Sequence, residues 1–205
     1  MNLSSDSAFI EKLRVFFQEI YFKNDIARDK NSILSSVAII IRNHEEIYEI
    51  LFIKRSEREY DNFSGHMAFP GGINEKIDKT GLDTSIRETY EEIGIDLKKD
   101  GLFLGQFSDY RPVNPKSNHL IVSPYIFFLK NPTVKINLNQ EEVVDTVWID
   151  LKILLELSIN SKRTTEKYNQ EYQDYVFNYK GYNIWGMTGK ILYMFINELK
   201  KINNF

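Results

Sequence analysis

The chain has 205 residues, 42% of them hydrophobic, which is enough for one well-packed domain with an appended helix. Its net charge of -3 argues against nucleic acid as a bulk electrostatic partner. It contains no cysteine, so disulfides, thiolate metal sites and cysteine nucleophiles are excluded.

Residues 1–30 predict an amphipathic helix. Between charged residues, apolar side chains recur at helical spacing at Phe9, Ile10, Leu13, Phe16, Phe17 and Ile20. This pattern differs from the unbroken apolar core of a signal peptide, and no run approaches the ~20 apolar residues of a membrane span. We therefore expect residues 1–30 to be a helical extension packed on a single domain of residues 31–205, in a cytoplasmic protein.

The middle of the chain predicts more strands than helices. Runs rich in β-branched and aromatic residues predict strands at 35–43, 47–55, 101–107, 119–130 and 143–150, and in two aromatic runs about a Lys180-Gly181 turn. Helices are expected at 84–93, at 151–157 and near both ends. This mixture predicts an α+β fold, an α/β/α sandwich in which a mixed sheet is covered by helices.

The helix expected at 84–93 has recognisable ends and a predicted core face. Asp83 or Thr84 can cap its start, and Gly94 suits the left-handed position that follows a helix. At about 100° per residue, three larger side chains share one sector, which we expect to be the core face. They are Ile86, Tyr90 and Ile93.

The opposite face of that helix gathers negative charge. Glu88, Glu91 and Glu92 stand at i, i+3 and i+4, where like charges destabilise a helix. A divalent cation would convert this repulsion into attraction, and carboxylate oxygens suit Mg²⁺ or Mn²⁺. The glycines at 71–72 allow a ligand to approach the backbone closely, and Arg87 can orient the carboxylates. The alternatives are a solvated acidic face and a docking face for a basic partner.

These residues resemble the Nudix box, G-x5-E-x7-R-E-U-x-E-E-x-G-U with U aliphatic. Residues 87–95 match it, with Thr89 in the first aliphatic position. The upstream half is longer by one residue, and Asp78 fills the acidic position. An expansion of this type is familiar in the coenzyme A pyrophosphatase-like branch, and Glu75 and Asp78 stand where that branch has acidic residues.

The resemblance extends beyond the box, which covers about residues 71–95. The segment 55–72 is similar to the one that precedes the box in that branch, with an Arg-Ser pair, a glycine and Phe-Pro-Gly-Gly in order. Residues 184–188, Ile-Trp-Gly-Met-Thr, resemble the opening of its last helix. The resemblance implies a Nudix fold with a mixed sheet flanked by helices.

The resemblance also implies a function: Mg²⁺- or Mn²⁺-dependent hydrolysis of a diphosphate bond in a nucleoside diphosphate linked to another moiety. The expected substrate is coenzyme A or acyl-CoA, giving 3′,5′-ADP and 4′-phosphopantetheine. The implied metal ligands are Glu88, Glu91, Glu92 and the carbonyl of Gly71. The candidates for the general base are Glu88, Glu91, Glu141 and Glu142. Candidates for substrate contact are Arg55, Arg58 and Arg111.

Several alternatives remain open at this level. The coenzyme A signature expects an arginine and a glycine where this chain has Tyr60 and Ser64, so ADP-ribose, dinucleotide or nucleotide-sugar diphosphates are alternative substrates. A non-catalytic Nudix binding module is a remote alternative, since such modules typically lose a helix glutamate. Partners other than a small-molecule nucleotide diphosphate are not expected, apart from a possible homodimer. His66 is expected to be structural, and both Trp148 and Trp185 are expected in the core.

Overall fold

The computed structural model describes residues 3–20, 26–57, 59, 64–113, 117–167 and 170–202. Its helices are α1 (Leu3–Val15), the π-helical turn η1 (Phe16–Ile20), α2 (Gly81–Ile93), α3 (Leu97–Asp100), α4 (Leu151–Ile159) and α5 (Gly186–Leu199). Its strands are β1 (Ile33–His44), β2 (Ile47–Arg55), β3 (Met67–Ala68), β4 (Gly71–Ile73), β5 (Gly101–Gln106), β6 (Leu120–Leu129), β7 (Val143–Asp150), β8 (Lys162–Lys167), β9 (Gln170–Tyr175), β10 (Phe177–Tyr179) and β11 (Tyr182–Ile184).

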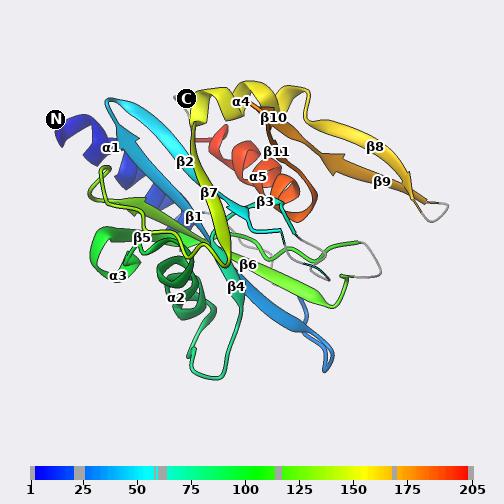
Figure 1. The fold of residues 1–205 in the computed structure, drawn as a ribbon. Coiled ribbons are helices and arrows are strands. Elements are labelled where there is room, and N and C mark those ends of the chain that lie inside the picture. Colours follow the sequence, from blue (N-terminus) through cyan, green and yellow to red (C-terminus); the bar gives the residue numbers. More distant parts are fainter. Residues whose placement is uncertain are drawn as a thin grey trace.

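A seven-stranded mixed sheet forms the middle layer. Its order is β3-β2-β1-β6-β5, with β4 also paired to β1 and β7 to β2. The long strands β1 and β6 run parallel, whereas β1 and β2 form the antiparallel hairpin predicted from the sequence. Helices α2 and α3 lie on one side of the sheet and α4 and α5 on the other (Figure 1). This is the sandwich of helices and mixed sheet that the sequence predicts.

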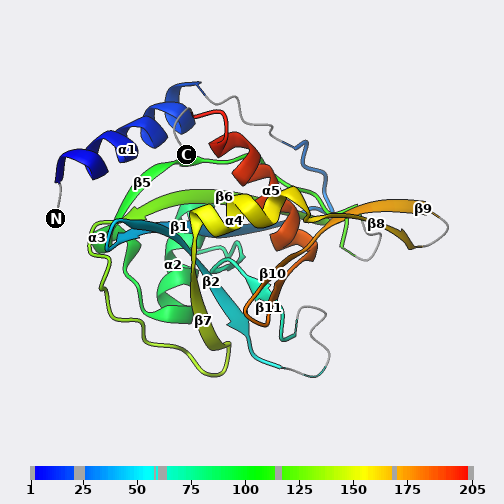
Figure 2. The ribbon, with the colours of Figure 1, turned by 90° about the horizontal axis from the view of Figure 1, so that it is seen from above.

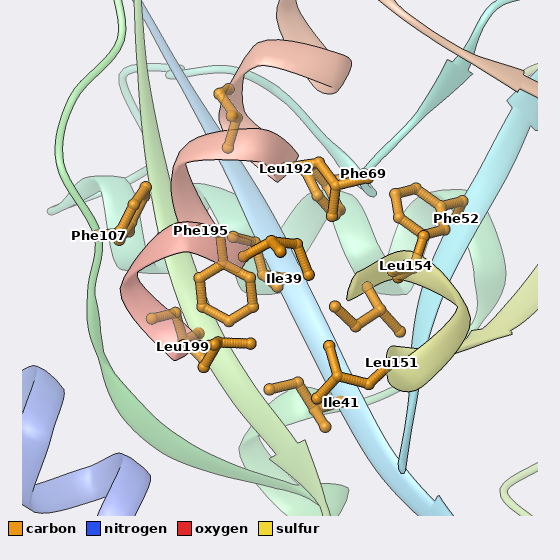
Figure 3. Close-up of a cluster of buried hydrophobic side chains, with 14 of the residues drawn as sticks. Ile39, Ile41, Phe52, Phe69, Phe107, Leu151, Leu154, Leu192, Phe195 and Leu199 are labelled. Atoms are coloured by element: carbon orange, nitrogen blue, oxygen red, sulfur yellow. The ribbon is translucent and has the colours of Figure 1, made fainter. Parts of the chain in front are cut away.

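The side chains of β1 alternate between the two faces of the sheet and contribute to both hydrophobic cores. Ile39 and Ile41 belong to the buried cluster under α4 and α5 (Figure 3), and Ala38 and Ile40 belong to the cluster under α2. All four are fully buried. Successive side chains of a strand point to opposite faces, so a continuous apolar run fits a strand covered on both sides. Burial of each isoleucine contributes about 1.5–3 kcal/mol.

The N-terminal helix packs on the sheet. Leu13 and Phe17 are buried in the cluster that includes α5, and the ring of Phe17 stacks on Phe195 with centroids 5.7 Å apart. Figure 2 shows α1 beside β5 and the end of α5. The division of the chain at residue 30 stays a prediction. Within the described residues, no helix combines the length and apolar character needed to cross a bilayer.

The β8–β9 hairpin is an element that the sequence analysis did not predict. The hairpin projects from the sandwich (Figures 1 and 2). Its two strands, Lys-Arg-Thr-Thr-Glu-Lys and Gln-Glu-Tyr-Gln-Asp-Tyr, lack the alternation of apolar and polar residues that marks a half-buried strand. Its pairing therefore leaves almost no signal in the sequence.

Candidate active site on helix α2

Helix α2 begins one turn earlier than predicted. Thr80 is the N-cap: its Oγ1 accepts a hydrogen bond from the Asp83 N–H at 3.2 Å, and Oδ2 of Asp83 accepts one from the Thr80 N–H at 2.9 Å. The prediction that Asp83 or Thr84 caps the helix is therefore wrong, because Asp83 is the third helical residue of a capping box. The predicted end is confirmed, since Gly94 has φ 72° and closes the helix.

The face that α2 buries also differs from the prediction. Tyr90, expected in the core, is 61% exposed, whereas Glu92, expected on the open acidic face, is 2% exposed. Ser85 and Thr89 are fully buried beside it. These small polar residues let the helix approach β4 closely, and their hydroxyls donate to backbone carbonyls within α2, which satisfies them without solvent. The helix is therefore rotated so that Tyr90 leaves the core.

Glu92 is a buried carboxyl group facing the Gly71-Gly72 turn. Its Oε2 accepts a hydrogen bond from the Gly71 N–H at 2.9 Å. Burial raises the pKa of Glu92 to about 8, and the negative charges of Glu88 and Glu142 act in the same direction, although the Gly71 hydrogen bond and the charge of Arg55 oppose it. A carboxyl with this pKa is mostly protonated at neutral pH unless a cation compensates its charge.

Glu88 lies one turn from Glu92 and over the same glycine turn. A Cβ placed on Gly72 would meet the Glu88 carboxylate, so this carboxylate lies directly against the glycine. Burial raises the pKa of Glu88, Arg87 lowers it, and the charges of Glu91 and Glu142 raise it further. The helix and the glycine turn thus bring several carboxylates into electrostatic contact.

Arg87 contacts this group of acids. Its Nε and Nη2 each lie 3.0 Å from an oxygen of Asp78, and its Nη1 lies 2.9 Å from Glu88 and 2.8 Å from Glu91. It also donates to the Ile73 carbonyl at 3.3 Å. The Arg87 hydrogen bonds hold the pKa of Asp78 down to about 2 despite its burial. These contacts place Arg87 between Glu88 and Glu91, and its orienting role stays a prediction.

Glu142 reaches the site from the loop before β7. The pairing of β2 with β7 shifts register between Lys54 and Arg55, and there the Ser56 N–H donates to the Glu142 carbonyl at 2.9 Å. Glu142 is half-buried and its charge raises the pKa of both Glu88 and Glu92, whereas Glu141 is exposed. Among the two predicted loop candidates, Glu142 is therefore the one beside the helix carboxylates.

The donor set fits a hard cation, although the carboxylates do not converge on a single point. Within the described part of the chain, no three His, Asp or Glu side chains form an arrangement that could hold a metal ion. Glu88 and Glu91 contact Arg87, and Glu92 contacts the Gly71 N–H. All the candidate donors are oxygens, as Mg²⁺ and Mn²⁺ prefer. The ligand set, including the Gly71 carbonyl, stays a prediction.

The other candidate residues are placed differently. Arg55 lies at the end of β2, where its charge acts on Glu92. Arg111 instead contacts the segment after α1, through the Ala27 carbonyl at 3.0 Å and Asp29 at 3.4 Å. Its contact with substrate stays an untested prediction. Arg58, like Tyr60, lies outside the described residues.

The two tryptophans, both predicted to lie in the core, differ in their burial. Trp148 packs partly buried against the core under α2, with the guanidinium of Arg42 4.0 Å from the centroid of its ring. Trp185 was expected in the core, but 38% of it is exposed, so that expectation is wrong. The buried neighbour Ile184 gives the reason, because adjacent side chains of an extended segment point in opposite directions. This alternation was the available signal for Trp185.

The raised pKa of Glu92 predicts a pH dependence of stability in the cation-free protein. The folded-state pKa of about 8 lies above the usual value of 4.5, so the folded state binds the proton more tightly than the unfolded state. The associated stability is present below pH 4.5 and is lost as pH rises through 8, by up to about 5 kcal/mol at ~1.4 kcal/mol per pKa unit.

Denaturant unfolding in EDTA between pH 5 and pH 9 measures this loss. Glu92→Gln, which cannot ionise, should flatten the profile over that range. If the stability profile of wild type coincides with that of Glu92→Gln, Glu92 does not have a raised pKa in the folded state.

Comparison with known proteins identifies the family. The NUDIX domain family model matches residues 33–168, so the chain belongs to the Nudix family. An uncharacterised protein of Schizosaccharomyces pombe is 35% identical over 128 residues, 58% of this chain and 38% of that protein. An uncharacterised Nudix hydrolase, NudL, of Photorhabdus laumondii is 28% identical over 150 residues, 73% of this chain and 77% of the relative.

A further relative is the peroxisomal coenzyme A diphosphatase ndx-8 of Caenorhabditis elegans, 29% identical over 163 residues, 78% of this chain and 66% of the relative. The chain thus spans less than two thirds of the fission-yeast and nematode relatives. A MutT/nudix family protein of Enterococcus faecalis shares the fold, with a TM-score of 0.54 and 13% identity over 94% of this chain and 73% of the other. The predicted fold and the predicted family, Nudix, are confirmed.

Proposed function

We propose that this chain hydrolyses a diphosphate bond in a nucleoside diphosphate linked to another moiety, with Mg²⁺ or Mn²⁺ as cofactor. The observation that carries the proposal is the group of Glu88, Glu92 and Glu142, whose charges act on one another, with Glu88 against Gly72 and Glu92 bonded to the Gly71 N–H. Burying several carboxylates side by side costs stability, and a cation bridging them to substrate phosphates would offset that cost.

The reaction is attack of water on phosphorus, with cleavage of the P–O bond to the bridging oxygen. When bound, the cation would supply charge for the phosphoryl oxygens and lower the pKa of the attacking water. Glu88, Glu91 and Glu92 would hold it together with the carbonyl of Gly71. Because Arg87 fixes Asp78 at the base of α2, its guanidinium would keep the helix carboxylates directed towards the glycine turn.

A general base completes the chemistry. Glu88 and Glu91 are the candidates on the helix. Glu142 is the candidate on a separate loop. It is half-buried, and its charge acts on both Glu88 and Glu92. A carboxylate on a separate element can accept the proton of the attacking water while the helix carboxylates remain ligands. We favour Glu142 for this role over Glu141.

Coenzyme A or an acyl-CoA is the proposed substrate, with 3′,5′-ADP and 4′-phosphopantetheine as products. Support comes from the segment 55–72 and from the nematode relative named as a coenzyme A diphosphatase. The alternative is an ADP-ribose, dinucleotide or nucleotide-sugar diphosphate, favoured by Tyr60 and Ser64 in the signature positions. A binding module without catalysis is disfavoured because all the helix glutamates are present. The cytoplasmic location and the homodimer stay predictions.

A substrate panel tests the proposal. Purified protein is incubated with coenzyme A, ADP-ribose and a diadenosine polyphosphate, with Mg²⁺ or with EDTA, and products are separated by chromatography. We expect Mg²⁺-dependent release of 3′,5′-ADP from coenzyme A, and faster turnover of another compound would move the assignment to the alternative. Tight binding of one compound without turnover of any would identify a binding module and overturn the proposed enzyme.

A further inference from the structure

Trp185 is an exposed aromatic side chain next to the buried Ile184. Its neighbour Ile184 is fully buried, whereas 38% of Trp185 is exposed, at the start of α5. Trp185 is the N-cap residue, yet it makes no side-chain capping hydrogen bond. A tryptophan gives large apolar contact area when covered, so partial exposure of its ring leaves a surface suited to a ligand.

Trp185 is held firmly at this position. Its ring rests on the imidazole of His66, with centroids 4.6 Å apart and planes tilted by 55°. In the same hairpin, the Tyr182 hydroxyl donates to Asp145 of β7 at 2.6 Å. The strand that carries Ile184 lies beside β3, as Figure 1 also shows. The indole is therefore preorganised, and a ligand that covers it has little side-chain entropy to remove.

A short series of contacts connects Trp185 to the carboxylates. The His66 carbonyl accepts a hydrogen bond from the Arg55 N–H at 3.0 Å, and the Arg55 charge acts on Glu92. The strand that follows His66 leads to Gly71, whose N–H contacts Glu92. The backbone that carries His66 is thus bonded to the end of β2, which carries Arg55, and continues to the glycine turn beside Glu92.

We propose that Trp185, backed by His66, is the platform on which the planar base of the nucleotide stacks. This inference rests on the proposed function and adds a binding role for a residue outside the box. A phosphate beside Arg55 and the helix carboxylates would leave the attached nucleoside to extend towards the exposed indole. Stacking of a base on an aromatic side chain tolerates different bases, so the platform selects nucleotides as a class.

Fluorescence tests the platform without any turnover. The chain has two tryptophans, so Trp148→Phe leaves Trp185 as the sole indole while keeping a ring under Arg42. In EDTA, titration of this variant with ADP is expected to quench the emission, and ribose 5-phosphate, which has no base, is expected to leave it unchanged. Equal quenching by both compounds, or none by either at millimolar concentration, would overturn the platform.

Kinetics provide an independent measurement. The pair of substrates is coenzyme A and an analogue of coenzyme A that lacks only the adenine base. Trp185→Leu is expected to lower the ratio of their kcat/KM values by about tenfold, mainly through the KM for coenzyme A. Trp185→Phe should restore most of the ratio, because it keeps an aromatic face. The same ratio in Trp185→Leu and wild type would contradict the proposal.

The fluorescence and kinetic experiments distinguish a failure of the stacking platform from a failure of the proposed enzymatic function. Quenching by ADP without hydrolysis of any diphosphate would refute the enzyme and leave the platform standing. Hydrolysis with an unchanged substrate ratio in Trp185→Leu would refute the platform and leave the enzyme standing. A melting curve of Trp185→Leu close to that of wild type shows that the variant is folded, as expected for a partly exposed side chain.

Discussion

Glu92→Gln is expected to lower kcat by about 10²–10³-fold, the usual effect of removing one preorganised electrostatic group from an active site. The same change should leave the melting temperature unchanged or raise it. Glu92 is buried and disfavours its charged form, so an uncharged amide of the same shape removes a desolvation cost. The amide oxygen can still accept the hydrogen bond from the Gly71 N–H. Turnover and thermal unfolding, measured on the same preparation, test the expected effects on kcat and on the melting temperature.

Glu156→Gln is the matched control. Glu156 is exposed on α4, across the sheet from α2, so this variant should match wild type in both measurements. Near-wild-type turnover of Glu92→Gln would remove Glu92 from the mechanism. Loss of folding in that variant would instead show that its charge, and not its shape, supports the fold.

Arg87→Ala is expected to cause the largest loss of stability, about 3–5 kcal/mol, as for a buried ion pair from which one partner is removed. The Asp78 side chain is 4% exposed and would be left without its cation, and Glu88 would lose a contact as well. Urea unfolding at pH 7 measures the loss. Arg14→Ala breaks an ion pair that is exposed on α1 and should not shift the transition.

A second variant separates charge from packing. In Arg87→Ala/Asp78→Asn the buried carboxylate is absent, so the double variant should be more stable than Arg87→Ala alone. In wild type the depressed pKa of Asp78 supplies stability that is present above its ordinary pKa and is lost as pH falls from about 4 towards 2. Additive losses in the double variant would show that Arg87 and Asp78 do not stabilise each other.

Much of the fold follows from the sequence because long apolar strands carry a strong signal. The run that forms β1 is apolar on both faces, which is typical of a strand covered by helices on both sides. Gly94 predicted the end of α2, where a left-handed residue is needed. The sequences of the β8–β9 strands gave no such signal, since they are mostly polar and lack an apolar alternation.

The residues of the candidate site were predictable from the sequence, but the burial of their side chains was not. The carboxylates of α2 stand out because their spacing destabilises a helix. Their environment depends on how the helix is rotated, and Ser85 and Thr89 are small enough for it to bury a polar face that simple periodicity assigns to solvent. Glu92 is therefore buried and Tyr90 exposed. The sequence also could not show that Glu142, on a distant loop, lies beside α2.

Binding of Mn²⁺, followed by the paramagnetic resonance signal of the free ion, tests the central claim that these carboxylates hold a divalent cation. Wild-type protein titrated with Mn²⁺ in the absence of nucleotide is expected to reduce the free-ion signal. Glu88→Gln/Glu92→Gln should restore that signal, while Glu156→Gln should behave as wild type. Equal Mn²⁺ binding by wild type and the double variant would contradict a cation site on α2.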